Sequence, residues 1–350
     1  MKTTHSLHTA DARQLDFLAD ASVHLVVTSP PYPMIEMWDE VFGALHPPVA
    51  EALAREEGLA AFEAMHQVLD AVWAECFRVL VPGGFACINI GDATRTMAKQ
   101  FRLFHNHARV VTAMTRLGFT VLPDILWRKP TNAPTKFMGS GMLPAGAYVT
   151  YEHEYVLIFR KGGKRVFGSA AERARRRRSA FFWEERNLWF SDVWSDLRGR
   201  DQFLSSGVTR TRSAAFPFAL PARLIWMYSA YGDVVLDPFA GTGTTLAAAL
   251  VAGRSSIGVE HAEGLEGPVA ESLAAGLESG RSRIEARLEA HRRFVAERLA
   301  ADKSLLHHNT PHDVPVMTRQ ETALELLAPL RMAETAPRCW VVELGPPESS

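Results

Sequence analysis

The sequence is poor in cysteine, carries almost no net charge and has no long apolar segment. Its three cysteines, Cys76, Cys87 and Cys339, are far apart in the sequence and form no Cys-x-x-Cys pair, so neither a disulfide framework nor a zinc site is implied. No apolar run approaches the roughly 18 residues of a membrane span, and no apolar signal core follows the amino terminus. We therefore expect a cytoplasmic protein without membrane contact. With 350 residues, 47% of them hydrophobic, the chain can bury a sizeable core.

The net charge of −1 hides an uneven distribution of charge. Residues 160–212 contain fourteen Lys or Arg and six Asp or Glu, so this segment carries +8 and the rest of the chain −9. A concentrated basic segment is what a phosphate backbone attracts, and an acidic remainder limits nonspecific attraction elsewhere. The distribution therefore favours a nucleic-acid partner that contacts this segment.

A glycine turn follows the apolar residues 234–236 and precedes a helical stretch. Asp237 stands at the expected strand tip, and Gly241 and Gly243 let the backbone pass close to a ligand there. A phosphate loop would need a Lys-Ser/Thr pair after the last glycine, and a dinucleotide fingerprint would need a third glycine where Leu246 stands. Both of those sites are excluded. The remaining alternatives are another ligand turn and an ordinary strand-to-helix turn.

A second motif, Thr28-Ser29-Pro30-Pro31-Tyr32, comes directly after the apolar residues 23–27. Two consecutive prolines remove two amide donors and fix the backbone, which leaves bare carbonyl acceptors beside a hydroxyl and an aromatic ring. A surface polyproline turn is the structural alternative. The strand before this motif and the glycine turn some two hundred residues later favour a functional pair.

Together these two motifs resemble the S-adenosylmethionine-dependent DNA amino-methyltransferases, which methylate the exocyclic nitrogen of cytosine or adenine. The resemblance covers residues 6–262, with the catalytic motif before the cofactor motif, as in the permuted group of that family. It implies an α/β fold with a doubly wound, mostly parallel, Rossmann-like sheet, an inserted recognition region and a helical C-terminal extension. The implied catalytic residues are Ser29, Pro30, Pro31 and Tyr32. No cysteine follows a proline, which argues against methyltransferases that attack carbon 5 of cytosine.

The resemblance also implies a set of residues around S-adenosylmethionine. Asp11 would lie near adenine, although it is equally well explained as the amino-terminal cap of a helix over residues 12–18. Glu260 follows Asp237 by 23 residues, the offset at which a carboxylate accepts both ribose hydroxyls in nucleoside-binding sheets. Residues 262–265 lack the aromatic that relatives carry, so adenine stacking stays unassigned. The implied cofactor-binding residues are Asp11, Thr28, Phe216, Asp237, Pro238, Phe239, Gly241, Gly243, Thr244 and Glu260.

Two further segments are expected to contact DNA. Trp127-Arg128-Lys129-Pro130 resembles the family's tryptophan-lysine-proline segment beside the target-base pocket. The second segment is the basic run with Arg173 and Arg175 to Arg178, which is followed by Phe181, Phe182 and Trp183. Arginine and aromatic side chains together are suited to phosphate contact and base stacking. A charged helix over a small aromatic core is the structural alternative. The implied DNA-binding residues are Trp127, Lys129, Arg173, Arg175, Arg176, Arg177 and Arg178.

The pattern of apolar residues predicts the order of elements. Helices are expected over residues 59–80, 105–117 and 280–303, and strands over 85–90, 119–127, 155–159 and 255–259. Residues 33–58 are expected to form a loop with one helical turn. Its position suits a lid or a DNA-facing loop and is equally compatible with an ordinary surface loop. We divide the chain into 1–162 and 213–279 as the two halves of a methyltransferase domain, 163–212 as a recognition region and 280–350 as a helical extension and tail.

Three functions follow from the resemblance. Serine at the first position of the catalytic motif favours methylation of cytosine N4 in a flipped-out base, with adenine N6 as the alternative and an idle DNA-binding subunit as the third. No metal and no covalent intermediate are expected. The expected partner is double-stranded DNA at the nucleoid, and the resemblance is compatible with a cognate restriction endonuclease and with a homodimer.

Overall fold

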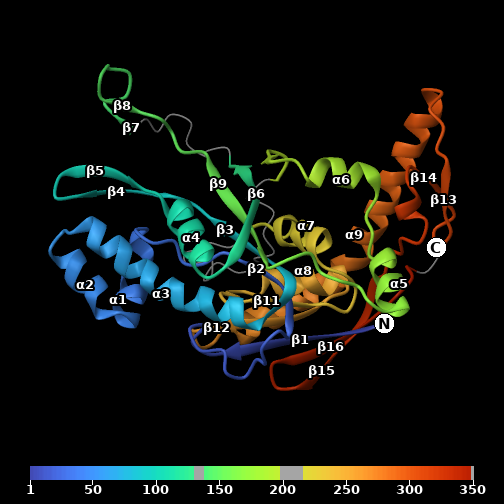
Figure 1. The fold of residues 1–350 in the computed structure, drawn as a ribbon, viewed down its shortest axis with the longest axis horizontal. Helices are drawn as coiled ribbons and strands as arrows, with labels where there is room; N and C mark the ends of the chain where they lie inside the picture. The colour runs from blue at the N-terminus through green and yellow to red at the C-terminus, as the bar shows by residue number, and fades with distance from the viewer. Residues whose placement is uncertain (130–137, 198–215, 348–350) are drawn as a thin grey trace.

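The structure, a computed structural model, describes residues 1–129, 138–197 and 216–347. Its centre is a ten-stranded sheet with helices on both faces (Figure 1). In spatial order its strands are β10 (Val193–Trp194), β6 (Phe119–Arg128), β9 (His153–Lys161), β3 (Leu80–Ile90), β2 (Val23–Thr28), β11 (Val234–Asp237), β12 (Ser255–Glu260), β1 (Lys2–Thr9), β16 (Cys339–Gly345) and β15 (Ala328–Ala336).

The five central strands, from β3 to β1, are parallel to one another. On one side of them β9 runs antiparallel to both β3 and β6, and on the other side β16 runs antiparallel to β1 and to β15. The catalytic-motif strand β2 lies directly beside the glycine-turn strand β11, with Leu25 opposite Val235. Two motifs far apart in the sequence therefore end at the same sheet edge, which we call the carboxyl edge, where α/β folds bind their ligands.

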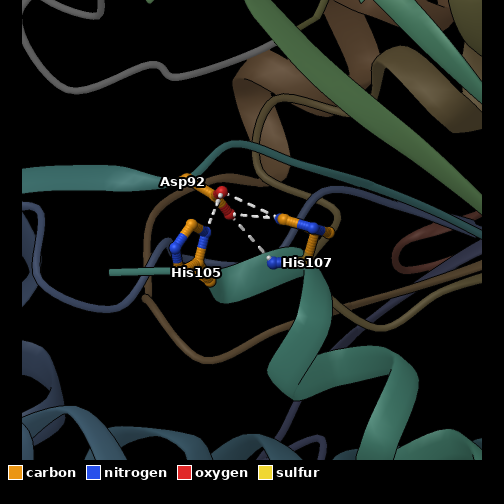
Figure 2. A group of neighbouring side chains, drawn as sticks. All are labelled: Asp92, His105 and His107. Carbon is orange, nitrogen blue, oxygen red and sulfur yellow. Dashed lines mark hydrogen bonds and ion pairs between the residues drawn. The ribbon is translucent and has the colours of Figure 1, made fainter. Parts of the chain in front are cut away.

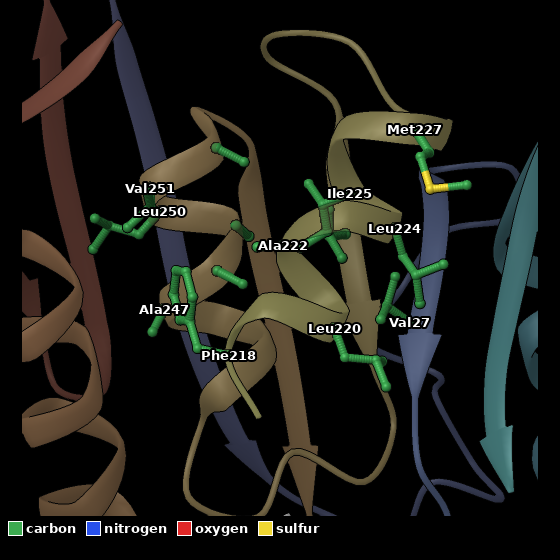
Figure 3. Packing of buried hydrophobic residues seen from close by; sticks show 14 of the residues in the cluster. Val27, Phe218, Leu220, Ala222, Leu224, Ile225, Met227, Ala247, Leu250 and Val251 are labelled. Carbon is green, nitrogen blue, oxygen red and sulfur yellow. The ribbon is translucent and has the colours of Figure 1, made fainter. Parts of the chain in front are cut away.

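Alternate residues of the central strands feed two separate hydrophobic cores. On β2, Leu25 and Val27 pack on one face and Val26 on the other, as the two-residue period of a strand requires. The first face is covered by α7 (Ala219–Tyr228), α8 (Thr244–Ala252) and α9 (Glu266–Ala300). Figure 3 shows Val27 beside Leu220 and Leu224 of α7. The second face is covered by α3 (Gly58–Val79) and α4 (Asn106–Arg116). This is the predicted doubly wound α/β architecture.

Several predicted elements are confirmed, and two predictions are wrong. Residues 12–18 form turns without a helix. Residues 33–58 form η1 (Glu36–Trp38), α1 (Asp39–Leu45) and α2 (Pro47–Ala54) instead of a loop with one helical turn. Pro47 misled the prediction because proline fits the first turn of a helix, where its missing amide has no intrahelical partner.

Other elements were missed altogether. Two hairpins project beside the carboxyl edge at the left of Figure 1, one formed by β4 (Ala93–Met97) and β5 (Gln100–Phe104), the other by β7 (Met138–Gly139) and β8 (Ala147–Tyr148). The expected C-terminal helix is the second half of α9. The chain then adds β13 (His307–Asn309), β14 (Val314–Val316), η2 (Arg319–Glu321) and the two sheet strands β15 and β16. No helix in the described ranges is long and apolar enough to span a bilayer.

Candidate active site

Asp237 is the buried polar centre of the carboxyl edge, with only 2% of its surface exposed. Its carboxylate accepts 2.6 Å hydrogen bonds from the hydroxyls of Thr28 and Thr245 and a 3.0 Å bond from the amide of Phe239. Burial, with a smaller contribution from the charge of Glu260, raises the pKa of Asp237 to about 6. A carboxylate held by neutral donors in such a place favours a cationic ligand.

The glycine turn connects Asp237 to Glu260. The amide of Gly241 donates to one carboxylate oxygen of Glu260 at 2.9 Å, and the amide of Ala262 donates to the other at 3.0 Å. Gly243 has a φ of 84° and would bring a Cβ atom within 3.1 Å of Val269, so only glycine fits where α8 begins. Each oxygen of Glu260 keeps a free lone pair, so the carboxylate can accept further hydrogen bonds from a ligand.

A cavity of about 710 Å³ opens between these groups and the catalytic motif. Its volume lies in the range of small-molecule sites, about 300–1,000 Å³. Thr28 and Gly243 support the cavity without lining it. The predicted residues that line it are Asp11, Ser29, Pro30, Pro31, Phe216, Asp237, Pro238, Phe239, Gly241, Thr244 and Glu260.

One wall of the cavity was not predicted. It comes from η1 and α1, in the segment expected to be a lid or a DNA-facing loop. The helix is only seven residues long, too short for a periodic pattern to stand out in the sequence. Trp38, the last residue of η1, supplies an aromatic surface, which residues 262–265 lack. The unpredicted lining residues of this wall are Met37, Trp38, Glu40, Val41 and Leu45.

Asp11 lies at the cavity and does not cap a helix. Its side chain accepts the amide of Arg13 at 2.9 Å and both of its oxygens contact the Arg13 guanidinium, which lowers the pKa of the Asp11 carboxyl. The same guanidinium donates to the carbonyl of Leu45 at 3.1 Å. Asp11 is therefore tied both to its own turn and to the end of α1.

The catalytic motif continues on the far side of Ser29 into a hydrogen-bonded group of side chains. Ser29 Oγ lies 3.1 Å from the hydroxyl of Tyr32, which donates to Glu154 at 2.9 Å. Asn89 donates to both Tyr32 and Glu154, and Lys129 pairs with Glu154 at 2.5 Å. Asn89 and Glu154 were not among the predicted site residues. The signal for Asn89 was its position at the end of a strand, whereas β9 gives no local sign that its first residues reach the site.

Trp127 was predicted to contact DNA, and that prediction is wrong. Its side chain is only 1% exposed and its indole nitrogen donates to the carbonyl of Leu197 at 3.1 Å, so it belongs to the core. Lys129 lies at the site with 42% of its side chain exposed, its ammonium 4.8 Å above the Trp127 ring. Pro130, which completes the predicted segment, lies outside the described residues.

Asp92, His105 and His107 gather beside the site (Figure 2), with potential metal-ligating atoms within 4.8 Å of one another. Asp92 accepts the backbone amide of His107 at 3.1 Å, in the first turn of α4, and contacts the two Nδ1 atoms at 2.8 and 3.3 Å. These contacts account for the group as a cap of α4. We therefore assign it no metal role.

The predicted arginine run lies on α5 (Ala170–Arg178), near the amino ends of the parallel strands and therefore opposite the carboxyl edge (Figure 1). Arg175 pairs with Asp233, the residue just before β11, and Arg178 pairs with Glu325. Arg176 stacks over Phe167. A second cavity of about 1430 Å³ near these amino ends is lined by Arg173, Arg176 and Arg177. The run is therefore remote from the catalytic motif, and its contact with DNA stays a prediction.

Three of the aromatics that follow the run form a core, which is the structural alternative named for this segment, whereas Phe181, Trp183 and Phe190 line the second cavity. Phe182 is fully buried and stacks on His291 with ring centres 3.8 Å apart. Trp189 and Trp194 are 5% and 1% exposed. These side chains have no surface on which a base could stack.

The chain is similar to several known proteins. Residues 23–266 match the model of a family described as DNA methylase. Type II methyltransferase M.MthZI of Methanothermobacter thermautotrophicus is 49% identical over 330 residues, which cover 94% of this chain and 92% of that protein. Type II methyltransferase M.MjaI of Methanocaldococcus jannaschii is 47% identical over 282 residues, covering 77% of this chain and 91% of that protein.

A solved structure is also similar. A putative DNA modification methylase from Thermus thermophilus, in complex with S-adenosyl-L-methionine, matches with a TM-score of 0.61 and 34% identity. The match covers 78% of this chain and 94% of that one.

Proposed function

The chain belongs to the DNA methylase family whose model it matches, and on that premise we propose that it transfers a methyl group from S-adenosylmethionine to N4 of cytosine in double-stranded DNA. The observation that carries the proposal is one cavity lined by both Ser29 and Asp237. The acceptor for the target amine and the residues for the cofactor thus share one space.

The residues of the cavity fit S-adenosylmethionine, the ligand of the similar Thermus structure. Asp237 offers a buried carboxylate to a cationic ligand, and Glu260 offers lone pairs to the ribose hydroxyls. Asp11 and Trp38 supply a polar edge and an aromatic face for adenine. When bound, the cofactor supplies an electrophilic methyl group on a sulfonium.

The protein's part of the chemistry is to localise the lone pair of an exocyclic amine, which is otherwise conjugated into the ring. The target base leaves the helix at a cost of about a few kcal/mol. Ser29 Oγ and the carbonyl of Pro30 accept hydrogen bonds from the two amine protons, which turns the nitrogen lone pair toward the cofactor side of the cavity. After methylation the nitrogen releases one of these protons to solvent. Positioning of this kind supplies up to about 7–11 kcal/mol of the barrier reduction in well-oriented systems.

Ser29 supports cytosine over adenine because, in this family, serine at the first motif position accompanies many cytosine N4 enzymes. Adenine N6 is the second candidate, since a serine hydroxyl accepts equally well from either amine. Incubation of unmethylated DNA with labelled cofactor, followed by mass spectrometry of the nucleosides, tests the proposal. We expect N4-methylcytosine with the wild type and almost none with Ser29→Ala. N6-methyladenine as the sole product would overturn the base assignment.

We further propose that DNA lies against the two hairpins at the carboxyl edge. Residues 93–104 contain Arg95, Lys99 and Arg102 and no acidic residue, and Arg95 is held by Asp39. The two hairpins are joined by Phe101 and Tyr148, whose rings stack with centres 4.8 Å apart. Basic residues beside the catalytic cavity are suited to the phosphates that flank a flipped base.

The organisation and partners of the chain are parts of the same proposal. We retain the division into residues 1–162, 163–212, 213–279 and 280–350, of which 198–212 lie outside the described residues. A cognate restriction endonuclease would recognise the same DNA sequence, so methylated DNA from an expressing host should resist its cleavage. If the protein forms a homodimer, sedimentation of the purified protein should give twice the mass of one chain.

A further inference from the structure

Glu154 reaches the catalytic motif because of the direction of its strand. Since β9 is antiparallel to β3, its first residues lie beside the last residues of β3, and Val156 pairs with Asn89. The Glu154 carboxylate therefore stands at the carboxyl edge, 2.9 Å from the hydroxyl of Tyr32 and 2.7 Å from the amide nitrogen of Asn89. Its other oxygen faces Lys129.

We propose that Glu154 is a positioning residue that sets the direction of the hydrogen bonds between Tyr32 and Ser29, so that Ser29 meets the target amine as an acceptor. This inference rests on the proposed function and goes beyond it, since Glu154 acts through two other residues.

The direction follows from what each group can donate. A carboxylate only accepts, so the single proton of the Tyr32 hydroxyl is used on Glu154. The two amide protons of Asn89 point to Glu154 and to the Tyr32 oxygen, at 2.7 and 2.8 Å. The reverse orientation of the amide would set its carbonyl oxygen against the carboxylate, so Glu154 fixes this orientation as well.

Ser29 is the last member of this chain of donors. The Tyr32 oxygen has already given its proton to Glu154, so across the 3.1 Å contact it accepts the proton of Ser29. Apart from a long contact of 3.5 Å with Asn89 Nδ2, the lone pairs of Ser29 Oγ are then left for a donor in the cavity. An exocyclic amine is such a donor, and hydrogen bonds from its two protons hold it with its lone pair turned toward the cofactor side of the cavity.

The surroundings hold this arrangement in place. A Cβ atom at Gly91 would lie 3.1 Å from the Tyr32 ring and 3.2 Å from Glu154 Cγ, so the two side chains are packed tightly against the backbone. Lys129 balances the charge of Glu154 and is itself held above the buried Trp127. Burial and the neighbouring carboxylate raise the pKa of Tyr32, which keeps the phenol protonated as a donor.

The test is a double-mutant cycle with Glu154→Gln, Tyr32→Phe and the combined variant. Glutamine keeps the shape but also donates, so the direction of the hydrogen bonds is no longer fixed. We expect Glu154→Gln to lower kcat about tenfold or more, with KM for the cofactor and melting temperature close to wild type. In the Tyr32→Phe background the same change should cost less than about twofold, because the group through which Glu154 acts is gone.

The controls separate this inference from the proposed function. Glu152→Gln, on the same segment but paired with Arg128 at 3.5 Å, should leave kcat unchanged. If Glu154→Gln fails to fold, Lys129→Met gives a second cycle on a side chain that is 42% exposed, with a smaller loss that also disappears in the Tyr32→Phe background. Equal losses in both backgrounds would overturn the role of Glu154. A folded wild type that transfers no methyl group to DNA would overturn the proposed function itself.

Discussion

Strand β11 joins two buried aspartates that differ in their hydrogen-bond partners and in the direction of their pKa shifts. Asp233 just before it and Asp237 at its end are 0% and 2% exposed. Burial alone would raise the pKa of Asp233, but Arg165, in contact at 2.5 and 2.9 Å, holds it below its usual value. At Asp237 the described partners are hydroxyls and one amide, and its pKa rises to about 6. A buried carboxylate supplied with cations by its own chain is structural, whereas one that lacks them is ready for a charged ligand.

Substitution of either aspartate by asparagine should have a large effect, on cofactor binding at one end of β11 and on stability at the other. Asp237→Asn should abolish detectable binding of S-adenosylmethionine, because it removes the carboxylate and keeps the fold. Asp233→Asn should instead lower the free energy of unfolding by about 3–5 kcal/mol, because it leaves Arg165 without its partner. Calorimetric titration and thermal unfolding of both variants check this. Wild-type cofactor affinity in Asp237→Asn would contradict the comparison.

Glu260→Ala should weaken cofactor binding by about 1.5–3 kcal/mol, the loss of a charge-assisted hydrogen bond. The substitution also removes the acceptor for the amides of Gly241 and Ala262, so the turn should loosen. Calorimetry with S-adenosylmethionine measures the first effect, and hydrogen exchange of the turn measures the second. Unchanged affinity would exclude Glu260 from the ribose site.

The raised pKa of Asp237 predicts a dependence of affinity on pH. Between the unfolded value near 3.8 and the folded value of about 6, the folded state holds a proton that the unfolded state has lost. The proton on Asp237 therefore contributes to the stability of the cofactor-free protein. This contribution is fully present below pH 3.8 and is lost as the pH rises through about 6. Cofactor binding should weaken in the other direction, by up to about tenfold per pH unit below 6. Kd measured from pH 5 to 8 checks this dependence, and a flat profile would contradict it.

Smaller effects are expected at the arginine edge. Arg173, Arg176 and Arg177 form no ion pair with any described residue, whereas Arg175 and Arg178 do. If the predicted DNA contact holds, each alanine substitution among the first three should reduce the slope of log K against log salt by about 0.9. Arg175→Ala and Arg178→Ala should reduce the slope less, because their guanidinium groups are already paired with Asp233 and Glu325. Lys99→Ala and Arg102→Ala provide the corresponding measurement at the hairpin edge, where we expect a reduction of the same size.

The sequence predicted the parts of the site that are local and missed those that depend on topology. Asp237 and Ser29 belong to short motifs whose neighbours in sequence are also their neighbours in space. Glu154 reaches the site only because β9 is antiparallel to β3. Trp127 belongs to a segment whose residues are typical of a DNA contact, yet its side chain is buried beside the sheet. The charge of the arginine run predicted that it is exposed to solvent, but its position relative to the carboxyl edge depends on the topology of the sheet.

If DNA is methylated at the carboxyl edge, its target cytosine must lie against the residues there, and photo-crosslinking detects such a contact. A DNA fragment that accepts labelled methyl groups from the wild type is substituted with photoreactive cytosine and irradiated in complex with the protein, and the crosslinked peptides are identified by mass spectrometry. We predict crosslinks within residues 29–45 and 89–104. Crosslinks confined to residues 170–178 would contradict methylation at the carboxyl edge.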